Sequence, residues 1–249
     1  MTLFNALVLA WMLLALALVP FQLRIAAPYG RHVRDGWGPR VPNRLGWFAM
    51  ELVSLVIFAA FFLFGPTAKS APMWIFFALW TAHYANRSLV FPLRLQTGGK
   101  AIPLLIVIGA ACFNVVNGGL NGFYLGSLAA TYPIEWLWDI RFVAGIAMFL
   151  SGAAINVWAD GRLIALRTDT TDYAIPRGGL FERISCPNHL GEIVQWSGFA
   201  LMCWSLPALS FAVWTAANLI PRALSHHAWY RARFPGYPLE RRAVIPFLL

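Results

Sequence analysis

The stretch that decides the fold runs from Asn156 to Glu192 and reads NVWADGRLIALRTDTTDYAIPRGGLFERISCPNHLGE. It begins at the end of an apolar helix, turns polar, passes through a Pro-x-Gly-Gly loop at residues 176–179, and returns to apolar sequence. Asn156, Asp160 and Arg167 are spaced by four and seven residues, which places them on one face of a helix with 3.6 residues per turn. An amide, a carboxylate and a guanidinium are therefore predicted to line up where this helix ends.

This polar row has two interpretations. It suits a phosphate-bearing ligand, because Arg binds phosphate and Asp or Asn binds hydroxyl and amide groups. It also fits a solvated helix end whose charges face water. Spacing alone leaves both interpretations open.

Composition indicates a membrane protein. The 249 residues are 59% hydrophobic and 12% charged, which is about half the charged share of a soluble domain. The net charge of +9 would suit nucleic acid, but the sequence has no basic module interleaved with aromatic residues, and excess Lys and Arg in membrane proteins mark cytoplasmic loops. The three cysteines lack metal-ligand spacing and are expected to be free thiols. We expect an integral, multi-pass protein that binds neither nucleic acid nor a metal.

Apolar runs predict seven spans. A Pro- and Gly-rich loop with five Arg separates the first two runs, and the run after residue 192 is too long for one span. Ser205-Leu206-Pro207 divides that run into a tight hairpin, although one long helix kinked at Pro207 is the competing interpretation. The expected spans cover residues 3–19, 45–64, 72–93, 101 to about 114–122, 136–160, and the two halves of 192–224.

The distribution of charge orients these spans. With the amino terminus outside, 16 of the 19 Lys and Arg fall in the inner segments, as the positive-inside rule requires. The sequence thus predicts an all-α fold with seven transmembrane helices and a cytoplasmic carboxy terminus. The tail from residue 222 to 249 is too polar to span and is expected to pack against the cytoplasmic face.

Two polar side chains inside the expected spans suggest chemistry. Glu51 lies among apolar residues, where a carboxylate costs several kcal/mol, so it is expected to be functional, paired or neutral. A neutral acid donates the hydrogen bond that a buried carbonyl substrate needs, although a structural bond between helices is the alternative. Tyr84 shares a helix face with Trp80 and Arg87 and is either a proton donor or an interfacial anchor. If Arg87 pairs with Glu51, the argument for a neutral acid weakens.

Known nucleotide-binding motifs are missing from the sequence. No Gly-x-Gly-x-x-Gly fingerprint and no Walker sequence is present. Loops and helix ends would therefore have to hold any nucleotide.

Several spaced motifs together resemble one family. The chain resembles the steroid 5α-reductases (3-oxo-5α-steroid 4-dehydrogenases), most closely from Asn156 onward, and is identified as a bacterial homologue. Weaker matches upstream are Tyr29-Gly30-Arg31-His32, Glu51, His83-Tyr84-x-x-Arg87, Asn117-Gly118 and Asp139-Ile140-Arg141-Phe142. The stronger matches are Pro176-x-Gly178-Gly179-Leu180-Phe181, Asn188-x-Leu190-Gly191-Glu192, Trp204-Ser205-Leu206-Pro207-Ala208 and Tyr237-Pro238…Arg241…Ile245-Pro246-Phe247.

The resemblance implies a monomeric enzyme of the bacterial inner membrane that uses NADPH, bound on the cytoplasmic side, to reduce the 4,5 double bond of a 3-keto steroid or another enone lipid. One domain would span residues 1–249, with about 1–100 on the substrate side and about 150–249 on the cofactor side. Glu51 and Tyr84 would contact the substrate carbonyl. The implied cofactor residues are Asn156, Asp160, Arg167, Asn188, Glu192, Tyr230, Arg241, Tyr29, Tyr173 and His226. Met50 stands where animal members carry Gln, which leaves a second substrate-side hydrogen bond open.

Three other functions fit parts of the pattern. A membrane methyltransferase of the isoprenylcysteine type would place S-adenosylmethionine in a polar carboxy-terminal site, but methyl transfer has no need of Glu51 and Tyr84. A reductase of a C14 or side-chain sterol double bond would use these two residues to protonate an alkene. A lipid-binding or scaffold protein has no reason to gather so many polar groups at helix ends.

Overall fold

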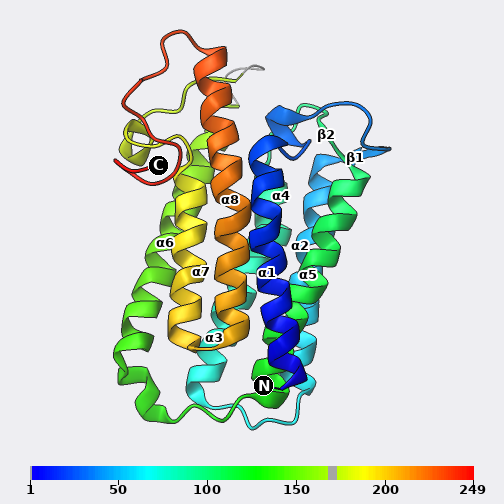
Figure 1. Ribbon diagram of the computed structural model, residues 1–249, viewed down its shortest axis with the longest axis vertical. Helices are drawn as coiled ribbons and strands as arrows, with labels where there is room; N and C mark the ends of the chain where they lie inside the picture. The colour runs from blue at the N-terminus through cyan, green and yellow to red at the C-terminus, as the bar shows by residue number, and fades with distance from the viewer. Residues whose placement is uncertain (1, 168–172) are drawn as a thin grey trace. The chain divides into compact units, whose positions relative to one another are not determined.

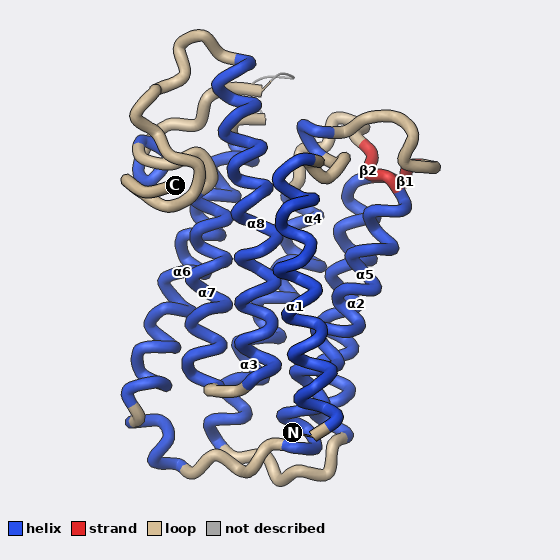
Figure 2. Tube along the Cα trace, viewed as in Figure 1, coloured by secondary structure: helices blue, strands red, loops and turns tan. Residues whose placement is uncertain are grey.

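The computed structural model describes residues 2–167 and 173–249, which are mostly helical (Figure 1). Figure 2 shows that the only strands of this described part form one short two-stranded ribbon. The helices and strands, in chain order, are α1 (Leu3–Arg24), β1 (Arg40–Pro42), α2 (Asn43–Phe64), α3 (Ala71–Ala85), α4 (Phe91–Arg94), β2 (Ala101–Pro103), α5 (Leu104–Phe123), α6 (Ile140–Ala165), α7 (Pro187–Cys203) and α8 (Leu206–Arg233). Shorter helical turns cover Gly30–His32, Asn86–Val90, Tyr124–Leu128, Ile134–Trp138 and Gly179–Glu182.

Several of these helices have the length and composition of membrane spans. Within the described residues, four are long and apolar enough to cross a bilayer: Leu3–Arg24, Asn43–Phe64, Leu104–Leu128 and Ile140–Ala165. In α1 the large side chains of Leu13 and Leu16 are more than half exposed, as expected of residues that face lipid. The all-α membrane class is thus confirmed, and the count of seven spans stays a prediction.

The chain separates into two compact units. The first contains residues 1–27 and 144–249, and the second contains residues 28–143. Glu51 and Tyr84 both belong to the second unit. Of the ten residues expected to bind the cofactor, only Tyr29 belongs to the second unit, and the other nine belong to the first.

In the first unit, α7 and α8 form the tight hairpin that the sequence predicted. The break falls at Trp204, whose φ of 45° is left-handed and ends α7. Ser205 then caps α8 by accepting a hydrogen bond from the backbone N–H of Ala208 at 3.4 Å, and Pro207 occupies the first turn, where a missing N–H costs nothing. The alternative of one helix kinked at Pro207 is therefore wrong.

Glycines bring α6 and α7 into backbone contact. Gly145 faces Gly198, and one heptad away Gly152 faces Gly191. A Cβ on Gly191 would lie 2.6 Å from the backbone nitrogen of Asn156 and 2.6 Å from the carbonyl oxygen of Gly152. Small residues allow such close approach between membrane helices. The contact places the start of α7 beside the polar end of α6.

In the second unit, α2 and α5 run side by side (Figure 1). They begin together because β1 pairs with β2 just before them, with Arg40 opposite Pro103. A Cβ on Gly118 or Gly122 would lie 3.2 Å or 2.7 Å from a backbone carbonyl oxygen of α2, so the two helices pack closely along this glycine row.

The fourth predicted span differs from the structure at its end. The sequence suggested that helical character fades between about Asn114 and Gly122, yet α5 continues to Phe123 and a π-helical turn extends it to Leu128. The asparagines of this stretch are buried: Asn114, Asn117 and Asn121 are 2–4% exposed. Because they do not face lipid, they reduce the apolar signal without ending the helix.

Candidate active site

Glu51 interacts with polar side chains from two other segments of the second unit. Its carboxyl group is hydrogen-bonded by Asn114 of α5 and interacts electrostatically with Arg87. Arg87 belongs to the π-helical turn Asn86–Val90, and its guanidinium lies over the rings of Trp47 at 4.9 Å and Phe91 at 4.5 Å. Single π-helical turns inside α-helices occur frequently at functional sites. The sequence left a pairing of Glu51 with Arg87 open, and the structure places the two within electrostatic reach.

Tyr84 lies one turn before Arg87, at the carboxy-terminal end of α3. It is 4% exposed and packs against Trp80 and His83, with ring centroids 5.3 Å and 5.0 Å away. Trp80 in turn stacks on Phe58 of α2 at 4.4 Å, which joins α3 to the helix that carries Glu51. A phenol and a carboxyl group, both suited to hydrogen-bonding a carbonyl oxygen, thus come from two packed helices.

In the first unit, three of the expected cofactor residues form one network. Asn156 donates from Nδ2 to the backbone carbonyl of Asn188 at 3.0 Å, and Asn188 donates from its own Nδ2 to Oδ1 of Asp160 at 3.1 Å. Asn156 and Asp160 are 3% and 8% exposed. The glycine contact between α6 and α7 makes this network possible, because Asn188 and Gly191 both lie within the first five residues of α7.

A second group of expected residues forms a chain of aromatic contacts. The guanidinium of Arg167 lies 5.4 Å from the ring centre of Tyr173, and Tyr173 meets Trp229 edge-on at 5.0 Å. Trp229 contacts its neighbour Tyr230, and Tyr230 stacks on Tyr237 at 5.3 Å.

Arg167 itself requires a correction. The spacing predicted it on the same helical face as Asn156 and Asp160, but α6 ends at Ala165, and Leu166 and Arg167 form a turn. The following residues, 168–172, lie outside the described part of the chain. The helix stops two residues before Arg167, so the periodicity of the helix does not place its guanidinium, which lies 5.4 Å from the ring centre of Tyr173.

Arg241 holds the Pro-x-Gly-Gly loop. It is 1% exposed, donates from Nη1 to the carbonyl oxygen of Pro176 at 3.0 Å, and lies 3.4 Å from Oε2 of Glu182. Glu182 also accepts the backbone N–H of Gly178 at 2.5 Å, and this bond, followed by the charge of Arg241, lowers the pKa of Glu182. Gly178 has a φ of 88°, a value that favours glycine. Arg241 therefore fixes the loop in this structure.

Three expected cofactor residues remain: His226, Glu192 and Tyr29. His226 of α8 is 9% exposed and packs on His189, the neighbour of Asn188, with ring centroids 5.6 Å apart. Glu192 lies on the first turns of α7, half-buried. Tyr29 packs in the second unit against the cluster of Met50, Ile102 and Val107.

The tail packs against the start of α7 and the later part of α8, and it is tied to the loop before α7. The sequence predicted a packed tail from residue 222 onward, but residues 222–233 still belong to α8, and the cytoplasmic side stays a prediction. Ser185 and Cys186 donate their backbone N–H groups to the carbonyls of Arg242 and Ala243. The hydroxyl of Ser185 also lies 2.7 Å from both Nδ1 of His227 and the hydroxyl of Tyr237. Burial, and then the charges of Arg231 and Arg242, lower the pKa of His227, so the ring is neutral here at pH 7. This arrangement is a scaffold that holds the loop in place.

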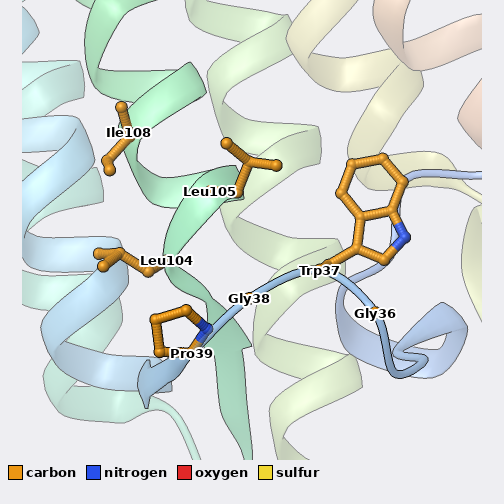
Figure 3. Close-up of a pocket in the computed structure, with 7 residues that line it drawn as sticks. All are labelled: Gly36, Trp37, Gly38, Pro39, Leu104, Leu105 and Ile108. Carbon is orange, nitrogen blue, oxygen red and sulfur yellow. The ribbon is translucent and has the colours of Figure 1, made fainter.

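A pocket of 290 Å³ lies elsewhere in the second unit (Figure 3). Apart from the indole nitrogen of Trp37, its lining side chains carry no polar atom. Neither Glu51 nor Tyr84 lines it, so it is distinct from the candidate site. Its lining is Gly36, Trp37, Gly38, Pro39, Leu104, Leu105 and Ile108.

The sequence did not point to Asn114 as a functional candidate. Asn114 contacts Glu51, yet in the sequence it looks like the point where a span fades. The available signal was the spacing of Asn114, Asn117 and Asn121 by three and four residues, which marks one helix face.

Fold and site define a class: an all-α membrane protein with buried hydrogen-bonding groups in one unit and a polar, Arg-bearing helix end in the other. Comparison with known proteins then gives the family. The family model described as 3-oxo-5-alpha-steroid 4-dehydrogenase matches residues 100–249. The chain is 42% identical to 3-oxo-5-alpha-steroid 4-dehydrogenase 1 of Bos taurus, over 97% of this chain and 96% of that protein. It is also 39% identical to steroid 5-alpha-reductase DET2 of Arabidopsis thaliana, over 90% of this chain and 88% of that protein. The chain belongs to the steroid 5α-reductase family.

Proposed function

We propose that this enzyme uses NADPH to reduce the 4,5 double bond of 3-keto-Δ4 steroids. The observation that carries the proposal is the grouping of Glu51 and Tyr84 on packed helices of one unit, in a chain that belongs to the steroid 5α-reductase family. A sterol is almost wholly apolar and carries few oxygens, so a membrane-embedded site with a few buried donors matches its chemistry.

The residues of the first unit fit a phosphorylated dinucleotide. Asp160 presents a carboxylate and Asn156 and Asn188 present amides, the groups that hydrogen-bond ribose hydroxyls and a carboxamide. Arg167 is only half-buried and supplies a guanidinium suited to phosphate. Tyr230, Tyr173, His226 and Glu192 would complete the site, Arg241 would keep its loop in place, and Tyr29 stays a predicted cofactor residue.

The mechanism that we propose assigns charge stabilisation to Glu51 and Tyr84. Both donate hydrogen bonds to the C3 ketone oxygen. Glu51 does so as a neutral acid, a form that its removal from water favours and that the nearby charge of Arg87 opposes. When bound, the reduced nicotinamide supplies the hydride that adds to C5. Negative charge then develops on the ketone oxygen, where donors in a water-poor site are most effective, and the Arg87 guanidinium adds a positive charge nearby. Water or a side chain protonates C4 and completes the saturated ketone.

The family match also helps to choose among the alternative functions. It favours a reductase over a methyltransferase, and a 3-keto steroid over a sterol that lacks an enone, since only an enone places negative charge on an oxygen for Glu51 and Tyr84 to stabilise. We retain the prediction of seven spans in a bacterial inner membrane, with a cytoplasmic cofactor site in a monomer.

The test is NADPH oxidation by the purified protein in detergent or lipid. We expect oxidation to depend on an added 3-keto-Δ4 steroid such as testosterone or progesterone, with NADH much less effective. The product should carry hydrogen at C5 in the α configuration. Binding of S-adenosylmethionine, with no binding of either nicotinamide nucleotide, would overturn the proposal in favour of the methyltransferase.

Loss of Arg167 tests the cofactor assignment. We expect Arg167→Ala to weaken the Kd for NADPH by about tenfold to a hundredfold, because a charge-assisted bond to phosphate contributes about 1.5–3 kcal/mol. The Kd for NADH should change far less if Arg167 contacts the extra phosphate. Arg233→Ala, at the exposed end of α8, is the matched control. An unchanged NADPH affinity in Arg167→Ala would remove Arg167 from the site.

A further inference from the structure

Asn114 is fixed to α2 by a bond that does not involve Glu51. Its side chain lies on α5, is 4% exposed, and donates from Nδ2 to the backbone carbonyl of Met50 at 2.7 Å. A backbone acceptor in a helix has little freedom to move. The amide is therefore held against α2 at the residue that precedes Glu51.

The amide has a second hydrogen, and the Glu51 carboxyl lies within its reach. Asn114 hydrogen-bonds that carboxyl group, while Arg87 interacts with it electrostatically. An Asn amide nitrogen carries two donors, so it can serve the Met50 carbonyl and Glu51 together.

If Glu51 is a neutral acid, its two carboxyl oxygens differ, and Asn114 bonds better to one of them. A protonated carboxyl group has one oxygen that only accepts and one that carries the hydrogen. An amide N–H bonds best to the accepting oxygen. When Asn114 occupies that oxygen, the hydroxyl is left to face a ligand.

We propose that Asn114 is a positioning residue for the reduction: it holds the accepting oxygen of Glu51, so that the Glu51 hydroxyl points at the substrate ketone. The proposal rests on the role given to Glu51 in the proposed function. It also accounts for Met50 in place of the Gln of animal members. In this chain Asn114 of α5 supplies the amide next to Glu51, and the residue before Glu51 does not.

A purely structural role is the competing explanation. A hydrogen bond between membrane helices stabilises their packing, and the bond to Met50 alone would do this. Asn121 offers a matched control on the same helix. It is 2% exposed and donates to Asn117 within α5, so Asn121→Ala removes a buried amide without touching the surroundings of Glu51.

The experiment measures kcat, KM for steroid and Kd for NADPH in full-length variants. We expect Asn114→Ala to lower kcat about tenfold or more with little change in the Kd for NADPH, because a misoriented catalytic group costs turnover. Asn114→Leu, which fills the space of the amide, should show the same loss, whereas Asn121→Ala should keep most of the turnover. In a Glu51→Leu background, Asn114→Ala should have no further effect, since a residue that acts through Glu51 loses its role with it.

Three outcomes overturn the inference. One is an Asn114→Ala variant as active as Asn121→Ala while Glu51→Leu is impaired. Another is an equal loss from Asn114→Ala in the wild-type and Glu51→Leu backgrounds, and the third is a normal kcat in Asn114→Leu. Full activity of Glu51→Leu would instead refute the proposed mechanism, so the two failures are distinguishable.

Discussion

Glu51→Leu is expected to lower kcat by about 10²–10³-fold, the usual effect of removing one donor to a developing oxyanion. Leu fills a similar volume and suits the membrane interior, so the helix should persist. Glu51→Gln keeps a weaker N–H donor and should fall between the wild type and Glu51→Leu. The Kd for NADPH should be unchanged in both variants, because the expected cofactor residues other than Tyr29 lie in the other unit.

The matched control is Glu135→Gln, which removes an exposed carboxylate outside the candidate spans. Steady-state turnover with saturating NADPH and steroid provides the measurement. Normal turnover in Glu51→Leu would exclude a role for Glu51 in the reaction.

Gly191→Ala should damage folding and cofactor binding together. The added Cβ would lie 2.6 Å from backbone atoms of Asn156 and Gly152, and neither can rotate away as a side chain would. Overpacking of this kind costs about 1–3 kcal/mol, and we expect a value near the upper limit. Separation of α6 from α7 would also pull Asn156 from Asn188, which should weaken the Kd for NADPH.

Gly109→Ala provides the comparison, because a Cβ at Gly109 meets no atom within 4 Å. Thermal unfolding in detergent and NADPH titration measure the two effects. If Gly191→Ala unfolds at the same temperature as Gly109→Ala, the helices are not in the contact described.

The sequence predicts well wherever one local rule decides the structure. The hairpin at Ser205–Pro207 follows from a capping residue and a proline, and its break appears at Trp204. Glu51 and Tyr84 stand out because polar groups are costly in apolar helices, and the structure places both on packed helices of one unit.

The rest depends on packing between helices, which periodicity does not encode. Asn114 looks like the end of a span until α5 is seen to bury it against α2. Arg167 fits a helical repeat, but α6 ends before it. Arg241 carries a phosphate-binding group, yet its guanidinium contacts Pro176 and Glu182, more than fifty residues earlier in the chain.

The glycine contacts between α6 and α7 also determine which parts of the first unit are able to move. Helices joined through side chains can slide as rotamers change, whereas helices whose backbones touch at two places one heptad apart have no such freedom. The α6–α7 pair is therefore expected to move as one body. Any opening around a bound nucleotide would therefore have to break the contacts that Arg241 and the tail make with the loop at 173–186, and not the contact between α6 and α7.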